Sequence, residues 1–73
     1  MPVAKHHRKL LGESVRDHRK GAKLTQEKLA EKSNLSTIFI SRIERGVESP
    51  SVDNLVKIAK GLGVRVRDII RDF

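Results

Sequence analysis

The stretch LTQEKLAEKSNLSTIFISRIERG, from Leu24 to Gly46, decides the fold of this chain. Thr25 can cap a short helix, because its hydroxyl accepts a hydrogen bond from a first-turn amide. Asn34 tolerates the left-handed conformation that ends such a helix. Ser36 can cap a second helix, and Gly46 is a typical residue just past a helix end. The stretch therefore predicts two short helices separated by a tight turn.

The apolar residues of this stretch predict that the two helices share a core. Ala30 lies on the inner face of the first helix, where a small side chain lets the second helix cross closely. The residues expected to fill the shared core are Leu29, Leu35, Ile40 and Ile43. Two capped helices joined by a tight turn form the helix-turn-helix motif.

Apolar spacing outside this stretch predicts three further helices. The first carries an inward stripe of Leu11, Val15 and His18 and ends near residues 21–23. Another starts at Pro50-Ser51 and ends at Gly63. Its apolar face is predicted to consist of Val52, Leu55, Ile58, Ala59 and Leu62. The last carries the stripe Val66, Ile69, Ile70 and Phe73. We expect an all-α fold of five short helices.

Length and charge indicate one small domain with a polyanionic partner. The chain has 73 residues, which is short for two independent cores. We divide it into a basic N-terminal arm or helix extension, residues 1–10, and a domain over residues 11–73. Lys and Arg number 16 against 9 Asp and Glu, a net charge of +7. Such a charge favours nucleic acid or another polyanion.

Several kinds of chemistry have no support in the sequence. The chain lacks Cys, and no apolar run approaches the roughly 18 residues that span a bilayer. We therefore expect a cytoplasmic protein without membrane contact. Adjacent His6 and His7 point about 100 degrees apart on a helix and have no partner at ligand spacing, so no metal site is predicted. His18 is interpreted as a partly buried structural residue. No catalytic residues, cofactor or small-molecule substrate are predicted.

The chain resembles the Cro/C1-type, or XRE-type, helix-turn-helix family of phage repressors, bacterial regulators and restriction-modification controller proteins. The resemblance runs from about Leu11 to Phe73. It rests on the motifs Leu24-Thr25-Gln26, Leu29-Ala30, Ile40-Ser41-Arg42-Ile43-Glu44-Arg45-Gly46, Pro50-Ser51, Leu55 with Ile58-Ala59, and Leu62-Gly63-Val64. It implies a compact five-helix, lambda-repressor-like domain that binds double-stranded DNA and regulates transcription without catalysing a reaction.

The resemblance also implies which residues contact DNA. The third helix, about residues 36–45, would enter the major groove. Its matching base-contact positions are Ser36, Thr37, Ile38, Ser41 and Arg42. An arginine there suits guanine O6 and N7, whereas threonine and isoleucine methyl groups suit thymine.

Other matching positions imply contacts around the recognition helix. Gln26 matches a position that contacts phosphate and braces the first residues of that helix. Arg45 and Gly46 would lie along the phosphate backbone, where Glu48 is an unexpected negative charge. Arg19 and Glu44 match positions that form a partly buried ion pair.

We further expect a symmetric homodimer on an inverted-repeat operator. Val66 and Ile69 should point inward, leaving an apolar patch for a two-fold partner. The predicted interface residues are Ile70, Phe73, Val64 and Val52. The alternative is that Phe73 folds back onto its own subunit and the protein dimerises only on DNA.

Three points stay open at the level of sequence. A protein-interaction module that keeps the fold without reading DNA is the competing hypothesis, and Thr37, Ile38 and Glu48 favour it. Phe39 is expected to pack against other protein residues, whereas Ile38 is equally suited to such packing and to contact with a DNA base. The sequence does not separate a phage repressor, a restriction controller and an antitoxin-type regulator, nor does it give the operator or the sign of regulation.

Overall fold

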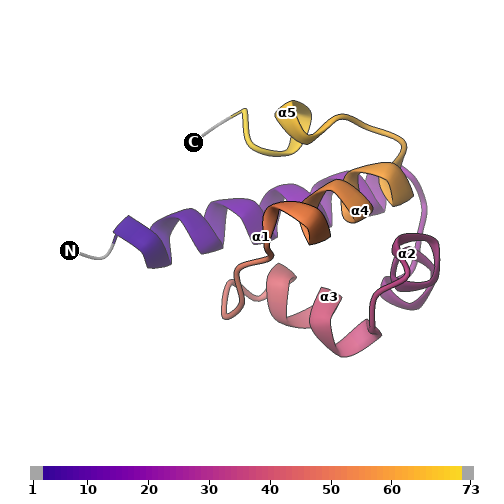
Figure 1. Cartoon of the computed structure of the whole chain (residues 1–73), viewed down its shortest axis with the longest axis horizontal. Helices are drawn as coiled ribbons and strands as arrows, with labels where there is room; N and C mark the ends of the chain where they lie inside the picture. The colour runs from indigo at the N-terminus through magenta and orange to yellow at the C-terminus, as the bar shows by residue number, and fades with distance from the viewer. Residues whose placement is uncertain (1–2, 72–73) are drawn as a thin grey trace.

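Five helices follow one another in the computed structural model, which describes residues 3–71 and the side chains of residues 6–71 (Figure 1). Their bounds are α1 (Val3–Gly21), α2 (Gln26–Ser33), α3 (Thr37–Glu44), α4 (Val52–Leu62) and α5 (Val66–Ile69). The predicted all-α fold of five helices is therefore confirmed.

Short polar side chains and left-handed residues set the helix ends where the sequence predicts them. The hydroxyls of Thr25, Ser36 and Ser51 each accept a hydrogen bond of 3.0 to 3.1 Å from the backbone amide three residues ahead. Asn34 ends α2 with φ 56°, and Gly63 ends α4 with φ 75°. A two-residue connection from Asn34 leads directly into the cap of α3, so α3 is held at a fixed angle to α2.

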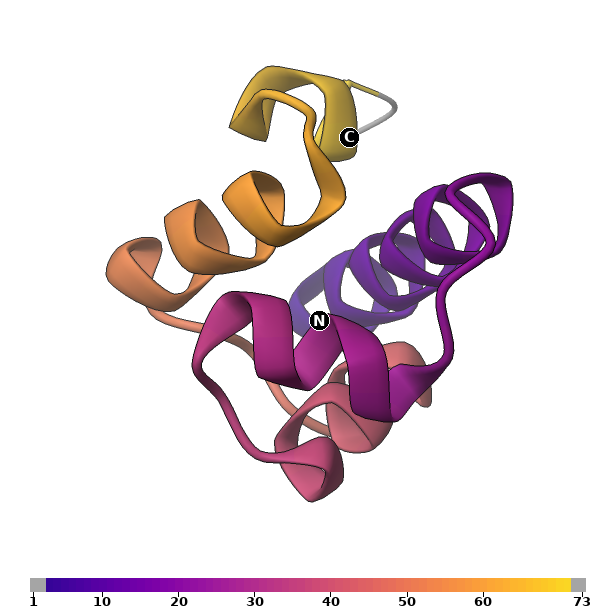
Figure 2. The ribbon, with the colours of Figure 1, turned by 90° about the vertical axis from the view of Figure 1, so that its right-hand side faces the viewer.

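The core lies where all the helices meet. α1 packs on α3, α2 packs on both α3 and α4, and α5 contacts α1 and α4 (Figure 2). Its largest fully buried side chains are Val15, Leu29, Ile40, Ile43, Ile58 and Ile69. Each such side chain stabilises the fold by about 1.5 to 3 kcal/mol relative to exposure. The motif helices α2 and α3 supply half of these residues, so the helix-turn-helix is built into the core.

One prediction about an apolar face differs from the structure. Val52 was expected on the packed face of α4, but 76% of it is exposed. It is the first residue of α4 and lies before the part that packs, whose buried residues are Ile58, Ala59 and Leu62. Leu11 and Val15 are buried as predicted, and His18 is half-buried, in agreement with its interpretation as a partly buried residue. Of the predicted last stripe, Val66 and Ile69 lie in α5 and Ile70 is its C-cap.

The N-terminal segment continues the first helix. α1 begins at Val3, so residues 3–10 of the basic stretch are helical and continuous with the rest of α1. The division of the chain at residue 10 stays a prediction. No helix in the described range is both long and apolar enough to cross a membrane.

Candidate nucleic-acid interface

The outward face of α3 carries the predicted base-contact residues. Ser36, Thr37, Ile38 and Arg42 are exposed, and Ser41 is half-exposed. All five are therefore accessible, and α3 itself lies on the side of the molecule opposite α5 (Figure 1). Whether they contact bases stays a prediction.

Two neighbouring apolar residues of α3 separate into different environments. Ile38 is 69% exposed, which is incompatible with packing in the core of this chain. Phe39 is half-buried and packs against the core, as its packing interpretation predicts. Because exposing an isoleucine loses the free energy of its burial, Ile38 is a candidate for contact with a partner molecule.

A buried polar cluster fixes the C-terminal end of α3 against α1. Arg19 Nε donates to Glu44 Oε2 at 2.6 Å, and Arg19 Nη2 donates to Glu44 Oε1 at 3.1 Å. Arg19 Nη1 also donates to the carbonyl oxygen of Leu24 at 2.8 Å. The expected ion pair is thus present, and it is bidentate, with side chains 12% and 3% exposed. This geometry fixes both distance and orientation between α1 and α3.

Gln26 belongs to the same cluster. Its amide Nε2 donates to Glu44 Oε1 at 3.0 Å. The resemblance implied that Gln26 braces the first residues of α3, but its side chain contacts Glu44, the last residue of that helix. The reason is that Glu44 is buried, and a buried carboxylate is stabilised by each additional donor. A phosphate contact by Gln26 stays a prediction.

Close backbone packing at Gly12 is a feature that sequence reasoning missed. A Cβ at this position would overlap the carbonyl oxygen of Ile43 and lie 2.8 Å from that of Glu44. The absent side chain lets α1 lie directly against the end of α3. A glycine inside an otherwise regular helix was the available signal, because it costs helix stability unless packing requires it.

The turn after α3 is closed by backbone hydrogen bonds. Gly46 has φ 76°, its amide donates to Ile43 O at 3.0 Å, and the Val47 amide donates to Arg42 O at 3.1 Å. This pattern is a Schellman motif, which reverses the chain and brings the residues beyond it back beside the last turn. Arg45 is exposed at the C-cap.

Glu48 lies beside the outward face of α3 as a result of this turn. Its Oε1 is 3.9 Å from Arg42 Nη1, and the two side chains are 37% and 55% exposed. The unexpected negative charge therefore has a partner, and that partner is the predicted guanine-reading residue.

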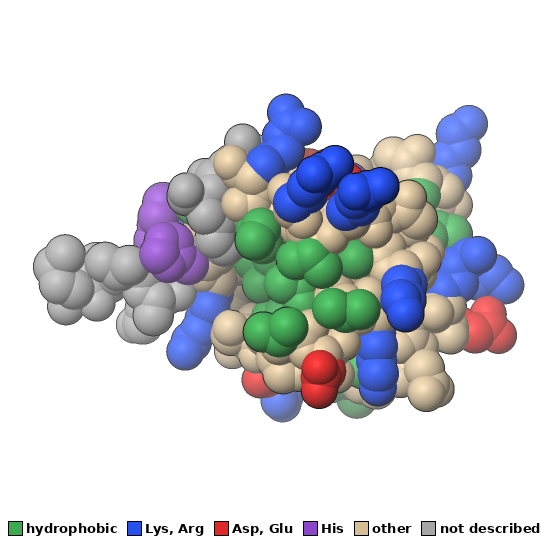
Figure 3. Space-filling model, turned by 45° about the horizontal axis from the view of Figure 1, so that its top comes forward, with side chains coloured by type: hydrophobic (Ala, Val, Ile, Leu, Met, Phe, Trp, Pro, Cys, Tyr) green, Lys and Arg blue, Asp and Glu red, His purple; other side chains and the backbone are tan. Residues whose placement is uncertain are grey.

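A second face of the molecule is apolar and lies away from α3. Figure 3 shows hydrophobic side chains gathered into one patch where α4 and α5 lie, with Lys and Arg side chains along its edges. The exposed large hydrophobics of these elements are Val52, Val56 and Ile70, and Ile70 is 38% exposed. Val64 is half-buried and packs against the core. Phe73 lies outside the described residues.

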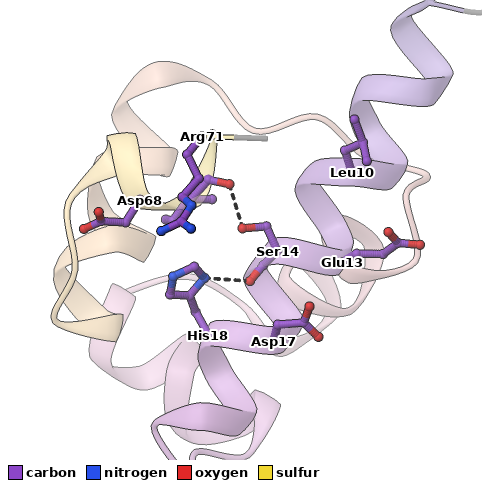
Figure 4. A pocket seen from close by; sticks show the side chains of 8 residues that line it. Leu10, Glu13, Ser14, Asp17, His18, Asp68 and Arg71 are labelled. Carbon is purple, nitrogen blue, oxygen red and sulfur yellow. Dashed lines mark hydrogen bonds between the residues drawn. The ribbon is translucent and has the colours of Figure 1, made fainter. Parts of the chain in front are cut away.

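One hydrogen bond, from Ser14, holds α5 against α1 beneath this face, and a second bond beside it lies within α1. Ser14 Oγ donates to Ile69 O at 2.6 Å, and His18 Nδ1 donates to Ser14 O at 2.9 Å (Figure 4). The side chains of Asp68 and Arg71 complete the rim of a hollow of about 250 Å³ at this junction. Within the described residues, no group of three or more His, Cys, Asp or Glu side chains is placed to hold a metal ion.

Comparison with known proteins supplies relatives over most of the chain. A helix-turn-helix family model matches residues 15–69. The chain is 45% identical over 67 residues to control protein C.BamHI of Bacillus amyloliquefaciens, covering 90% of this chain and 82% of that protein. It is 42% identical over 60 residues to an immunity repressor protein of Bacillus phage phi105, covering 82% of this chain and 42% of that protein.

Solved structures show the same arrangement of helices. The restriction-modification controller protein C.AhdI from Aeromonas hydrophila matches with a TM-score of 0.83 and 31% identity, covering 85% of this chain and 94% of that one. The regulator ClgR from C. glutamicum matches with a TM-score of 0.85 and 32% identity, covering 89% and 83%. The likeness thus extends from the motif to both flanking regions of the chain.

Proposed function

The chain belongs to the helix-turn-helix family of DNA-binding transcriptional regulators, and from this premise we propose that it occupies an inverted-repeat operator as a homodimer. A member of this family regulates transcription and is not an enzyme. The observation that carries the proposal is the accessible face of α3, on which the five predicted base-contact residues lie together. Its relatives include controller proteins and an immunity repressor, which act as regulators of the same general kind.

Each predicted base-contact residue of α3 recognises the base groups that its side-chain chemistry allows. Arg42 donates two hydrogen bonds to guanine O6 and N7 in the major groove. The methyl groups of Thr37 and Ile38 contact thymine C5-methyl groups, which gives the exposed isoleucine an apolar partner. Ser36 and Ser41 have short hydroxyl side chains that donate or accept at nearby base edges.

Phosphate contacts hold α3 in the groove. The Gln26 amide has a second N–H besides the one that donates to Glu44, and this N–H contacts a phosphate oxygen. Arg45 and the Gly46 segment lie along the backbone beyond the other end of α3. The net charge of +7 adds affinity that is independent of sequence and falls as salt rises.

The apolar face of α4 and α5 forms the dimer contact. Ile70 is at its centre, with help from Val64 and Val52, and the expected share of Phe73 falls outside the described residues. In a two-fold symmetric dimer, the patch of one subunit packs against the same patch of its partner, which removes exposed apolar area from both subunits. The Ser14 hydrogen bond keeps α5 in the position that presents Ile70. Two recognition helices then lie about 34 Å apart, one turn of DNA.

A binding-site selection from random or genomic DNA tests the DNA-reading part of the proposal. The expected product is an inverted repeat with half-sites spaced by about one helical turn. Enrichment of no sequence above background would contradict operator binding and favour a protein-interaction module.

Sedimentation equilibrium without DNA tests the dimer independently. The wild type is expected to be dimeric at micromolar concentration, and Ile70→Asp is expected to be monomeric, because the carboxylate would be buried without a partner. Ile38→Asp is the matched control, since it places the same charge on the exposed face of α3 and should remain dimeric. A monomeric wild type would rule out the stable dimer, and a dimeric Ile70→Asp would move the interface elsewhere.

A further inference from the structure

The contact between Arg42 and Glu48 is positioned by the backbone. The Schellman motif at the end of α3 fixes Val47 against Arg42 O, and Glu48 follows directly. Gly46, the left-handed residue of the motif, also lies against α1, where an added Cβ would be 3.2 Å from Lys9 Cα. The turn is therefore supported from two sides. Glu48 returns to the edge of α3 because the backbone directs it there.

The charge of Glu48 opposes the general charge of the DNA-facing surface. A carboxylate on this surface repels phosphate, in a chain whose net charge of +7 otherwise attracts it. Its effect is largest on the nearest cation, and Arg42 Nη1 is 3.9 Å away. Arg42 thus has a neighbour that partly neutralises it before any DNA arrives.

The guanidinium keeps enough donors to read a base while one nitrogen faces Glu48. Arginine has five N–H donors in a planar fork, and Glu48 lies next to Nη1. Guanine recognition requires two parallel donors at a fixed distance and angle. A phosphate oxygen accepts a charged donor from many directions, so contact with phosphate depends more on the charge of Arg42 than on its orientation.

We propose that Glu48 is a specificity-determining residue, which screens the charge of Arg42 so that Arg42 gains more from guanine than from any phosphate. The inference rests on the proposed DNA-reading role of α3. Glu48 acts through Arg42 and needs no contact with DNA. It lowers affinity for DNA of arbitrary sequence and so widens the ratio between operator and other sites.

The test compares operator and scrambled duplexes of equal length for the wild type, Glu48→Gln, Arg42→Gln and the double variant. Glu48→Gln is expected to raise affinity for scrambled DNA by about tenfold and for the operator by about threefold or less. The slope of log K against log salt on scrambled DNA should steepen by about one, because one more cation contacts phosphate. In the Arg42→Gln background the same change should alter either affinity by less than about twofold.

A charge removed elsewhere provides the control. Glu13→Gln, on α1 at the α5 side, changes the net charge by the same amount and should leave the specificity ratio unaltered. Thermal melting of each variant confirms that it is folded before binding is measured.

Three results would overturn the inference. If Glu48→Gln raised both affinities equally in both backgrounds, the residue would act as a simple charge. If it weakened operator binding, Glu48 would itself contact a base, for instance cytosine N4. If it left both affinities as in the wild type, the pair would have no effect on DNA. A wild type that does not distinguish operator from scrambled DNA would instead contradict the proposed function, so the two failures are separable.

Discussion

Two arginine and glutamate pairs, each with one member on α3, have the same chemistry and opposite surroundings. Arg19 and Glu44 are bidentate, with a shortest N–O distance of 2.6 Å and side chains almost wholly buried. Arg42 and Glu48 are 3.9 Å apart at their nearest atoms and substantially exposed. The first pair also bonds two further groups, the amide of Gln26 and the carbonyl oxygen of Leu24.

Burial determines what each pair contributes. An exposed pair stabilises a fold by about 0 to 1 kcal/mol, because water competes for both charges. A buried pair is different, since removing one partner leaves a charge without water, at a cost of about 3 to 5 kcal/mol. The pair at the α1 and α3 junction therefore holds α3 in place. The exposed pair leaves Arg42 available to a second molecule.

The largest expected effect follows from removing the buried arginine. Arg19→Ala should lower the free energy of unfolding by about 3 to 5 kcal/mol, because Glu44 is left buried with Gln26 as its remaining side-chain donor. Urea denaturation at fixed protein concentration measures this loss. Arg42→Ala is the control and should change stability by less than about 0.5 kcal/mol.

A double-mutant cycle checks that the loss comes from the pair. Replacing both members, as Arg19→Met with Glu44→Leu, should recover most of the stability that Arg19→Met alone removes, since no charge is then buried alone. A coupling energy near zero would show that Arg19 acts only through its aliphatic packing or its bond to Leu24.

The next effect concerns the backbone contact beside the buried pair. Gly12→Ala should destabilise the protein by about 1 to 3 kcal/mol, because the new Cβ overlaps the carbonyl oxygens at the end of α3. Gly21→Ala is the matched control, as its Cβ would meet nothing within 4 Å. Equal melting temperatures for the two variants would show that α1 and α3 separate at little cost.

The exposed pair should respond in binding instead of stability. Arg42→Ala is expected to weaken operator binding by about 1 to 3 kcal/mol and relax the preference at one base position. Gln26→Ala, which removes a predicted phosphate contact, should weaken binding to all sequences alike. Electrophoretic or fluorescence titrations at one salt concentration measure both. An equal loss on operator and scrambled DNA would make Arg42 a phosphate contact.

Local signals in the sequence predicted the elements and their ends. Thr25, Asn34 and Ser36 have side chains or conformational preferences that act within a few residues, so their roles follow from the sequence directly. Core positions such as Ile40 and Ile43 follow from spacing for the same reason. The pairing of Arg19 with Glu44 came from family resemblance, because their contact spans 25 positions of the chain.

Features that depend on the angle between elements were not predictable. The contact of Gln26 with Glu44 depends on how α2 crosses α3. The approach of Glu48 to Arg42 results from the turn at Gly46. The spacing of apolar residues describes positions within a helix and does not show where the chain runs after such a turn.

The smallest expected effect is on folding stability at the exposed pair. Glu48→Gln should change the free energy of unfolding by about 0 to 1 kcal/mol at low salt, and the change should vanish near 1 M salt, where the Debye length is about 3 Å. Glu31→Gln is the matched control, because Glu31 forms another exposed pair, with Lys28 at 3.1 Å. Urea denaturation of both variants at two salt concentrations, with the same protein concentration throughout, measures the change in the free energy of unfolding and its dependence on salt. A loss above about 2 kcal/mol for Glu48→Gln that persists at high salt would place Glu48 with the buried pair, as a residue that holds the turn after α3 together. Its influence on DNA binding would then come from the position of the turn and not from the charge of Arg42.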